Sequence, residues 1–250
     1  MPDPTNARRA VLLELVLGAM APGVALAVQP GLTLATGTRP PLTSSPGRIG
    51  FLDAVIHEAF RRIGLGVTLI SLPFERSLIN ANAGIEDGDP FRASGFEKEY
   101  SNLVQVREKV MDLDFVAYAT RADVQVGNWS DLARYNVTYV TGWKLLERNL
   151  KATQDVTTVR GLDQLFPLLA TGRVDVVLVD RWQGLWLARE ARLAVRALDP
   201  PLARVPMFTY LNRRHTALVE PLAAALAAVK RDGTWQRLYD QILTPLEAAR

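Results

Sequence analysis

The chain has 250 residues, of which 48% are hydrophobic and 22% are charged. This composition excludes a disordered chain and supplies enough apolar residues for one domain or two small ones. A formal net charge of +3, spread along the sequence, gives no support for nucleic acid binding. The absence of cysteine excludes disulfides, a thiol nucleophile and a lipid-modified cysteine after the leader.

The amino terminus has the pattern of a secretory signal peptide. Arg8 and Arg9 precede an apolar run that ends in Ala25-Leu26-Ala27, a small-x-small cleavage site. Residues 1–27 are therefore predicted to be removed, which places the mature protein in the periplasm. No later apolar stretch reaches the length of about 20 residues that a membrane-spanning helix needs.

The first half of the chain predicts strands that alternate with helices. Two amphipathic helices stand out, one that begins near Asp53 and stops near Gly64, and one that follows Pro73. Strands are predicted at 31–36, 67–72, 87–89, 103–106 and 114–119, with helices at 53–63 and 73–83 and a tight polar loop at 90–95.

The second half repeats this alternation after a polar crossing segment at 120–129. Its organising element is an almost unbroken β-branched run at 174–179 closed by Asp180, the pattern of a strand buried on both faces. Asp199-Pro200-Pro201 is predicted to break the chain. Further strands are predicted at 137–140 and 206–211, and helices at 144–150, 165–171, 182–197, 217–229 and 234–242.

A short motif occurs twice, 88 positions apart. A helix ends at Gly84 and is followed by Asp87, and a second helix ends at Gly172 and is followed by Asp175. We therefore expect an α/β fold with two similar lobes and a ligand between them. The predicted division is residues 28–118 and 206–250 for lobe 1 and residues 119–205 for lobe 2, with two hinge crossings.

The order of these signals resembles the bacterial extracellular solute-binding proteins of family 3, the polar amino acid type. The likeness covers roughly residues 32–243 and rests on Arg39-Pro-Pro-Leu42, Gly50-Phe-Leu-Asp53, the two Gly-x-x-Asp motifs and Asp232-Gly-Thr-Trp235. It implies the class II periplasmic-binding-protein fold, in which each lobe is a central sheet flanked by helices. It also implies a receptor that closes like a Venus flytrap on a solute and delivers it to the permease of an ABC transporter.

The same resemblance nominates residues for the ligand site. Asp180 matches the acid that meets the ligand ammonium, Gly142 and Trp143 match the helix-start turn, and Phe74 matches an aromatic that packs on the ligand. The usual clamping arginine is missing, and Arg92 is the nearest substitute. Because Arg39, Arg76 and Lys144 add positive charge near the same place, an anionic or dicarboxylic ligand is favoured over a cationic one.

Other chemistries receive less support from the sequence. His57 and His215 lack the companions of a metal site, and no nucleotide-binding or hydrolase motif is present, so neither a metal nor a cofactor is expected. Two alternatives stay open. One is a dehydratase-like enzyme of the same fold that uses Glu75 or Asp89 as the acid or base, and the other is a sensor or partner-binding protein without transport. A monomer is expected.

Overall fold

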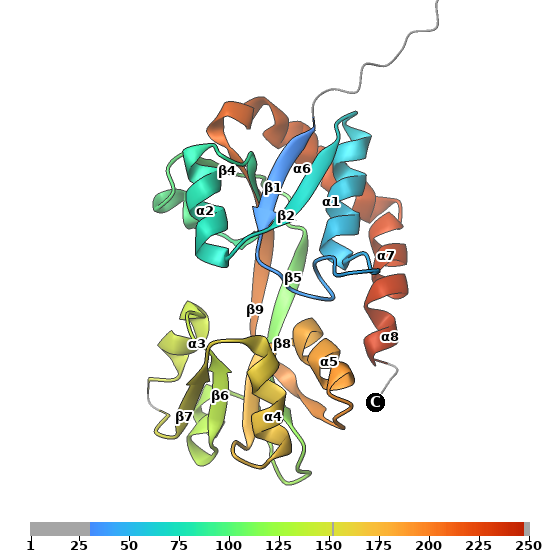
Figure 1. Cartoon of the computed structure of the whole chain (residues 1–250). Helices are drawn as coiled ribbons and strands as arrows, with labels where there is room; N and C mark the ends of the chain where they lie inside the picture. The colour runs from blue at the N-terminus through green and yellow to red at the C-terminus, as the bar shows by residue number, and fades with distance from the viewer. Residues whose placement is uncertain (1–30, 152, 248–250) are drawn as a thin grey trace, which may run out of the picture.

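The computed structural model describes residues 31–151 and 153–247, so the predicted signal peptide lies outside the described residues. Its strands form one continuous sheet in the order β2-β1-β3-β9-β5-β8-β6-β7, with β4 paired to the end of β9 on the edge opposite β3. Helices cover this sheet at both ends, which gives the two lobes seen in Figure 1. The predicted α/β architecture with two lobes is confirmed.

The upper lobe in Figure 1 contains the amino-terminal part of the described chain and two long helices near its carboxyl end. Its strands are β1 (Leu32–Thr36), β2 (Val67–Ser71), β3 (Gly88–Ala93) and β4 (Leu103–Gln105), and its helices are α1 (Phe51–Arg62), α2 (Phe74–Ala83), α6 (Thr216–Arg231) and α7 (Thr234–Ile242). The predicted apolar face of α1, with Val55, Ile56, Ala59 and Phe60, is fully buried in the main core. Burial of this face against the sheet and α6 is what holds the helix in place.

The lower lobe is built on three parallel strands, β6 (Val137–Val140), β7 (Val156–Val159) and β8 (Val176–Asp180). All five residues of β8 are buried, as the β-branched run predicts. The helices of this lobe are α3 (Lys144–Asn149), α4 (Leu165–Ala170) and α5 (Arg181–Glu190), and the short carboxyl-terminal α8 (Thr244–Glu247) packs against α5. Short 3₁₀ helices lie at Phe96–Lys98, Trp129–Arg134, Leu162–Gln164 and Arg213–His215.

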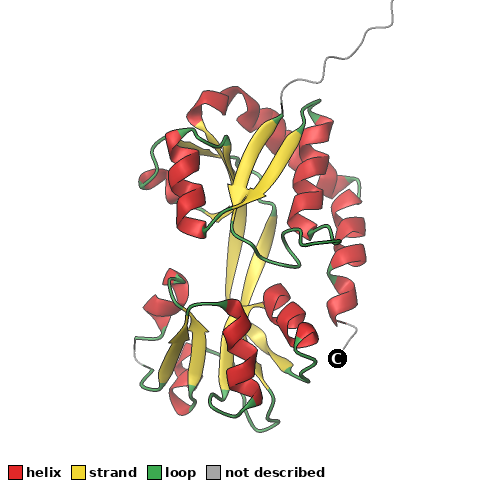
Figure 2. Cartoon of the chain, in the orientation of Figure 1, coloured by secondary structure: helices red, strands yellow, loops and turns green. Residues whose placement is uncertain are grey.

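Two long antiparallel strands connect the lobes, β5 (Met111–Ala119) and β9 (Arg196–Asn212). Figure 2 shows them as the two yellow strands that run from one lobe into the other. The segment 120–129, predicted as a crossing, follows the end of β5 and is not the connection. Both crossings are continuous strands, so no break in the chain marks where one lobe ends and the other begins. The predicted lobe boundaries at 118/119 and 205/206 therefore stay a proposal.

Two predicted breaks are instead parts of strands, because irregular pairing accommodates the prolines. The segment 90–95 was expected to be a loop, yet β3 continues to Ala93 with a register shift between Asp89 and Arg92. Likewise β9 passes through Asp199-Pro200-Pro201, where its register against β5 shifts between Phe115 and Ala117. Helix α5 ends at Glu190 and is therefore shorter than the helix predicted at 182–197.

The repeated motif has the same structural role in both lobes. Gly84 and Gly172 end their helices with positive φ angles of 77° and 67°, a conformation that suits glycine. The Asp87 carboxylate then accepts a hydrogen bond from the Thr33 backbone N–H at 2.7 Å, and Asp175 accepts one from the Asn136 N–H at 3.0 Å. Each aspartate therefore ties the start of one strand to the first strand of its lobe.

Asp87 also contacts Arg214 and His215, and these contacts predict a pH-dependent stability. Partial burial raises the pKa of Asp87, but hydrogen bonds from Thr33, Arg214 and His215 outweigh it and hold the pKa below its ordinary value of 3.8. The charged form thus stabilises the fold above about pH 4, and this contribution is lost as the pH falls through the lowered pKa.

We expect Asp87→Asn to lower the free energy of unfolding by about 1 kcal/mol at pH 7, because the pair is partly exposed to solvent. Urea titrations between pH 7 and pH 3 measure this difference, which should shrink below about pH 4. The exposed Asp163→Asn serves as the control and should change nothing. A difference that stays constant down to pH 3 contradicts this role for Asp87.

Candidate functional site

The site begins at a tight turn that follows β1 and fixes the backbone of Arg39. The Arg39 N–H donates to the Thr43 hydroxyl at 2.6 Å, and the Arg39 carbonyl accepts from the N–H groups of Leu42 and Thr43 at 2.8 and 2.9 Å. Leu42 is fully buried, which anchors the turn in the core of the upper lobe. The side chain of Arg39 therefore starts from a defined position.

The Arg39 guanidinium lies among three aromatic rings. Its Cζ atom is 4.9 Å from the ring centre of Phe74, 5.9 Å from that of Phe91 and 5.7 Å from that of Trp143. These distances are those of cation–π contacts. Phe74 and Phe91 belong to the upper lobe and Trp143 to the lower lobe, so this one side chain contacts both lobes.

Local packing sets the positions of the rings. A side chain at Gly37 would place its Cβ 2.2 Å from the Phe74 ring, so the glycine leaves the space that this ring takes at the end of β1. Trp143 precedes α3 and contacts Phe115 of the β5 hinge strand edge to face, with ring centres 5.5 Å apart. We call the three rings around Arg39, those of Phe74, Phe91 and Trp143, the aromatic cage. Its rings belong to both lobes, and Trp143 also contacts a hinge strand.

Arg92 also lies against the Phe74 ring, but most of its hydrogen-bonding capacity is used within the protein. Its Nε donates to Asp89 at 2.8 Å, and its Nη2 donates to the Phe74 carbonyl and the Ser77 hydroxyl, each at 2.6 Å. Asp89 is fully buried and accepts two further hydrogen bonds, from Ser77 and from the Phe91 N–H. The charges of Arg92 and Asp89 therefore neutralise each other.

Asp180 ends β8, as the sequence predicts, and its side chain also caps α5. It is fully buried, and one carboxylate oxygen accepts from the Gln183 N–H at 3.0 Å. The other oxygen, Oδ2, has no hydrogen-bond partner among the described residues, and neither has the Gln183 side-chain amide, which is 1% exposed. A buried polar group without a hydrogen-bond partner lowers the free energy of unfolding.

The charges of Asp180 and Arg39 each shift the pKa of the other group. Burial raises the pKa of Asp180, while the positive charge of Arg39 counteracts this shift. Burial in turn lowers the pKa of Arg39, the Asp180 carboxylate opposes it, and the nearby Arg92 adds to it. We use the name Arg39 cluster for Arg39, Phe74, Phe91, Arg92, Trp143 and Asp180.

Five of the eight residues predicted for the site thus lie in the Arg39 cluster, and three have other contacts. Arg76 is exposed on α2. Gly142 donates its N–H to the Glu147 carboxylate at 2.9 Å, and Lys144 forms an ion pair with the same carboxylate. Among residues 31–151 and 153–247, no hydrogen bond, ion pair or ring contact joins these three to the cluster. Their assignment to the ligand site stays a prediction.

Sequence reasoning did not nominate Phe91, Gln183 or Gly37. Phe91 lies in a segment predicted as a loop, so the sequence did not indicate that it belongs to a strand or which way its side chain points. Gln183 occupies the third position of a helix capped by Asp180, where the amide is buried, and only that spacing hints at it. Gly37 matters through the Phe74 ring, a contact between residues 37 positions apart.

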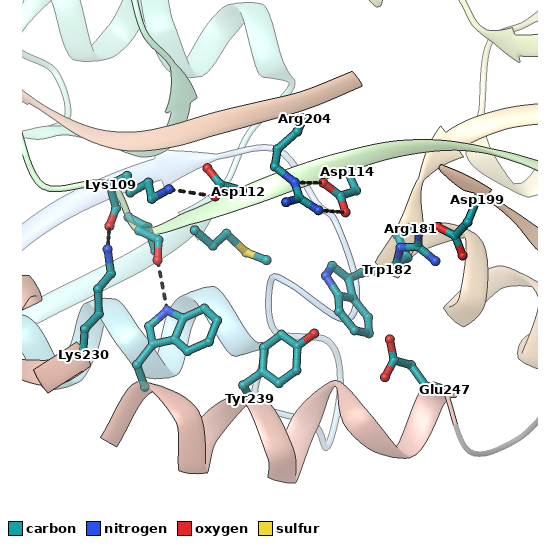
Figure 3. A pocket seen from close by; sticks show the side chains of 13 residues that line it. Lys109, Asp112, Asp114, Arg181, Trp182, Asp199, Arg204, Lys230, Tyr239 and Glu247 are labelled. Atoms are coloured by element: carbon teal, nitrogen blue, oxygen red, sulfur yellow. Dashed lines mark hydrogen bonds and ion pairs between the residues drawn. The ribbon is translucent and has the colours of Figure 1, made fainter. Parts of the chain in front are cut away.

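A separate cavity of about 800 Å³ lies on the other face of the hinge strands. Phe115 faces the Arg39 cluster, whereas Asp112 and Asp114 of the same strand face this cavity, because successive residues of a strand point to opposite sides. Figure 3 shows Asp114 bonded to Arg204, and Asp112 to Lys109. With Arg181 paired to Asp199 as well, these cavity charges compensate one another within the protein.

Trp182, two positions after Asp180, also lines this cavity. Its ring packs edge to face on Tyr239 of α7, with ring centres 5.3 Å apart. This contact joins the two lobes on the side of the hinge that faces away from the Arg39 cluster. None of the eight predicted site residues lines the cavity.

Neither residue proposed for an enzymatic alternative is placed to exchange protons with a ligand. Asp89 is engaged by Arg92, and Glu75 is exposed on α2. Within the described residues no group of three or more His, Asp or Glu side chains is arranged to hold a metal ion. In the same part of the chain, no helix has both the length and the apolar character needed to cross a membrane.

Comparisons with known proteins agree with this geometry. No protein-family profile matches the sequence. An uncharacterized protein of Shewanella oneidensis is 22% identical over 202 residues, which cover 78% of this chain and 76% of that protein.

Solved structures are more informative. The probable amino-acid ABC transporter extracellular-binding protein ytmK of Bacillus subtilis superposes with a TM-score of 0.74 at 17% identity, over 86% of this chain and 98% of that chain. An ancestral arginine-binding protein bound to arginine gives 0.71 at 18% identity, over 86% and 99%. A histidine kinase sensor domain similar to periplasmic binding proteins gives 0.70 at 16% identity, over 86% and 96%. The chain has the periplasmic-binding-protein fold.

In a periplasmic-binding-protein fold the two lobes move about the hinge strands, and a ligand is held where both lobes can touch it. The Arg39 cluster contains residues of both lobes and contacts β5 through Trp143. The sequence resemblance is confirmed at the level of the fold, because the neighbours named above are binding proteins and a sensor domain.

The ion pair between Arg92 and Asp89 leads to a stability prediction. Arg92 is 8% exposed and Asp89 fully buried, so removal of the guanidinium leaves an uncompensated buried carboxylate. We expect Arg92→Ala to lower the free energy of unfolding by about 3–5 kcal/mol. The control is Arg76→Ala, on exposed α2 surface, which should cost less than about 0.5 kcal/mol. Equal effects of the two substitutions in urea titrations would show that the pair does not stabilise the fold.

Proposed function

We propose that this protein is a periplasmic solute receptor. It binds a small carboxylate-bearing ligand, an amino acid or a similar organic acid, between its two lobes and delivers it to the permease of an ABC transporter. The structural neighbours named as an amino acid ABC transporter binding protein and an arginine-binding protein support this reading. Export by the predicted signal peptide, a monomeric state and the absence of enzymatic activity belong to the same proposal.

The observation that carries the proposal is a pair of oppositely charged groups in the Arg39 cluster, neither of which forms an ion pair among the described residues. Arg39 from the upper lobe makes ring contacts but no hydrogen bond from its guanidinium among the described residues. Asp180 from the lower lobe keeps one buried oxygen without a partner. A ligand with a carboxylate for Arg39 and a hydrogen-bond donor for Asp180 satisfies both groups at once.

Transport then follows from a population shift between open and closed forms. The ligand contacts both lobes only when they are closed, so the difference between its affinities for the two forms sets the closed fraction. The closed form is the one that a permease recognises in this proposal. Arg39 and Asp180 are the groups through which the ligand acts on the equilibrium.

A second candidate is a sensor that uses the same closure without transport. The similarity to a histidine kinase sensor domain favours it, at a TM-score close to those of the transport proteins. A stable complex of the protein with a permease would support transport, and binding to a membrane kinase would support sensing.

A thermal-shift screen of residues 28–250 tests the receptor proposal. The panel contains amino acids, dicarboxylates, polyamines and small aromatic acids. A ligand at a hundred times its dissociation constant should add about 2.7 kcal/mol of stability, which is several degrees. A flat screen over the whole panel speaks against solute binding.

With a ligand from that screen, Asp180→Asn tests the site. Asparagine still caps α5 but removes the charge, so the fold should persist while the affinity falls at least about tenfold. Titration calorimetry on the variant and on the exposed control Asp163→Asn measures this. Wild-type affinity in Asp180→Asn would end the assignment of Asp180 to the ligand.

A further inference from the structure

The aromatic cage of the Arg39 cluster has the form of a binding site for a cation. Three rings from two lobes lie within 6 Å of one positive group, and the buried Asp180 carboxylate attracts the same group. Proteins recognise cationic ligands with such cages, because the ring faces and the carboxylate both attract positive charge. In this chain the cation is the protein's own guanidinium.

We propose that Arg39 is an intramolecular occupant of a cation site and that it thereby makes the receptor selective for anionic solutes. The inference rests on the proposed function and names its ligand class. Solutes with guanidinium or alkylammonium side groups are excluded, because their place among the rings is taken. Organic acids are accepted, since the caged guanidinium offers its N–H donors to a carboxylate.

The backbone of Arg39 supports this role because it is held before any ligand arrives. Its N–H and its carbonyl are both bonded within the turn that contains Thr43. A residue on a free loop would leave the cage often, whereas a fixed backbone gives the guanidinium a high effective concentration there. A free cation therefore competes poorly with Arg39.

The charge distribution supports the same conclusion. Arg92 is neutralised by a direct contact with Asp89, at 2.8 Å. Arg39 has no such contact, and no ion pair links it to Asp180 among the described residues. The guanidinium of Arg39 is thus the positive group of the cluster that remains to be paired by a solute.

A second arginine of the same loop provides a matched control. The Arg48 guanidinium lies 5.0 Å from the ring centre of Trp186 in α5, so it also bridges the lobes by a cation–π contact. It faces a single ring, however, and Arg48 is exposed. Loss of Arg48 should therefore leave no cage that a free cation can enter.

The test is chemical rescue with methylguanidinium, at constant ionic strength. In Arg39→Ala the cage is vacant, and we expect saturable binding of methylguanidinium, seen as a rise in melting temperature and in calorimetry. Its affinity should exceed that of wild type and of Arg48→Ala by at least about tenfold. Equal binding to the folded Arg39→Ala variant and to wild type overturns the proposal.

Two further measurements keep the proposal testable if Arg39→Ala does not fold. Arg39→Met retains an unbranched apolar chain in the cage, and it should lose affinity for organic acids by at least about tenfold without gaining affinity for methylguanidinium. Wild type should bind malate or glutamate more tightly than arginine or agmatine. Tighter binding of arginine or agmatine by wild type refutes the anion selectivity but not solute binding. Failure of wild type to bind any solute refutes the proposed function, and the result of the methylguanidinium rescue stays valid.

Discussion

The antiparallel ladder between β5 and β9 is the constraint on which the rest of the structure depends. It carries the chain between the lobes twice, so every contact between the upper and lower sheets is organised around it. Its two faces have opposite character. One holds the Arg39 cluster through Phe115 and Trp143, and the other lines a cavity of paired charges closed by Trp182 and Tyr239. Any bend of the ladder moves both sets of contacts at once.

The site holds four charged groups, of which Asp89, Arg92 and Asp180 are buried and Arg39 is half-buried, and their charges are paired to different degrees. Arg92 and Asp89 are paired directly, with Ser77 and a backbone N–H taking the remaining positions on the carboxylate. Arg39 and Asp180 are stabilised only by aromatic rings, a helix cap and their attraction at a distance. Incomplete pairing costs stability in the free protein, and it is also what makes a bridging ligand effective.

Much of the fold could be predicted because its signals are local. The burial of β8 follows from a β-branched run, the ends of the helices from Gly84 and Gly172, and the place of Asp180 at the end of β8 from the same run. The misplaced segments contain prolines whose unpaired positions are absorbed by register shifts in long strands, which depend on partners far away in sequence. The nomination of Arg39 came from residue type and position alone. Its cage could not be foreseen, since Phe74, Phe91 and Trp143 meet only after the lobes are assembled.

The central claim is that the Arg39 side chain joins the lobes, and a distance measurement between them tests it most directly. The chain has no cysteine, so spin labels can be attached to Ile79→Cys on α2 and Arg148→Cys on α3 without background. In the absence of solute, pulsed electron paramagnetic resonance should give a larger fraction of short distances for wild type than for the same protein with Arg39→Ala added. Identical distributions with and without the Arg39 side chain would contradict the account.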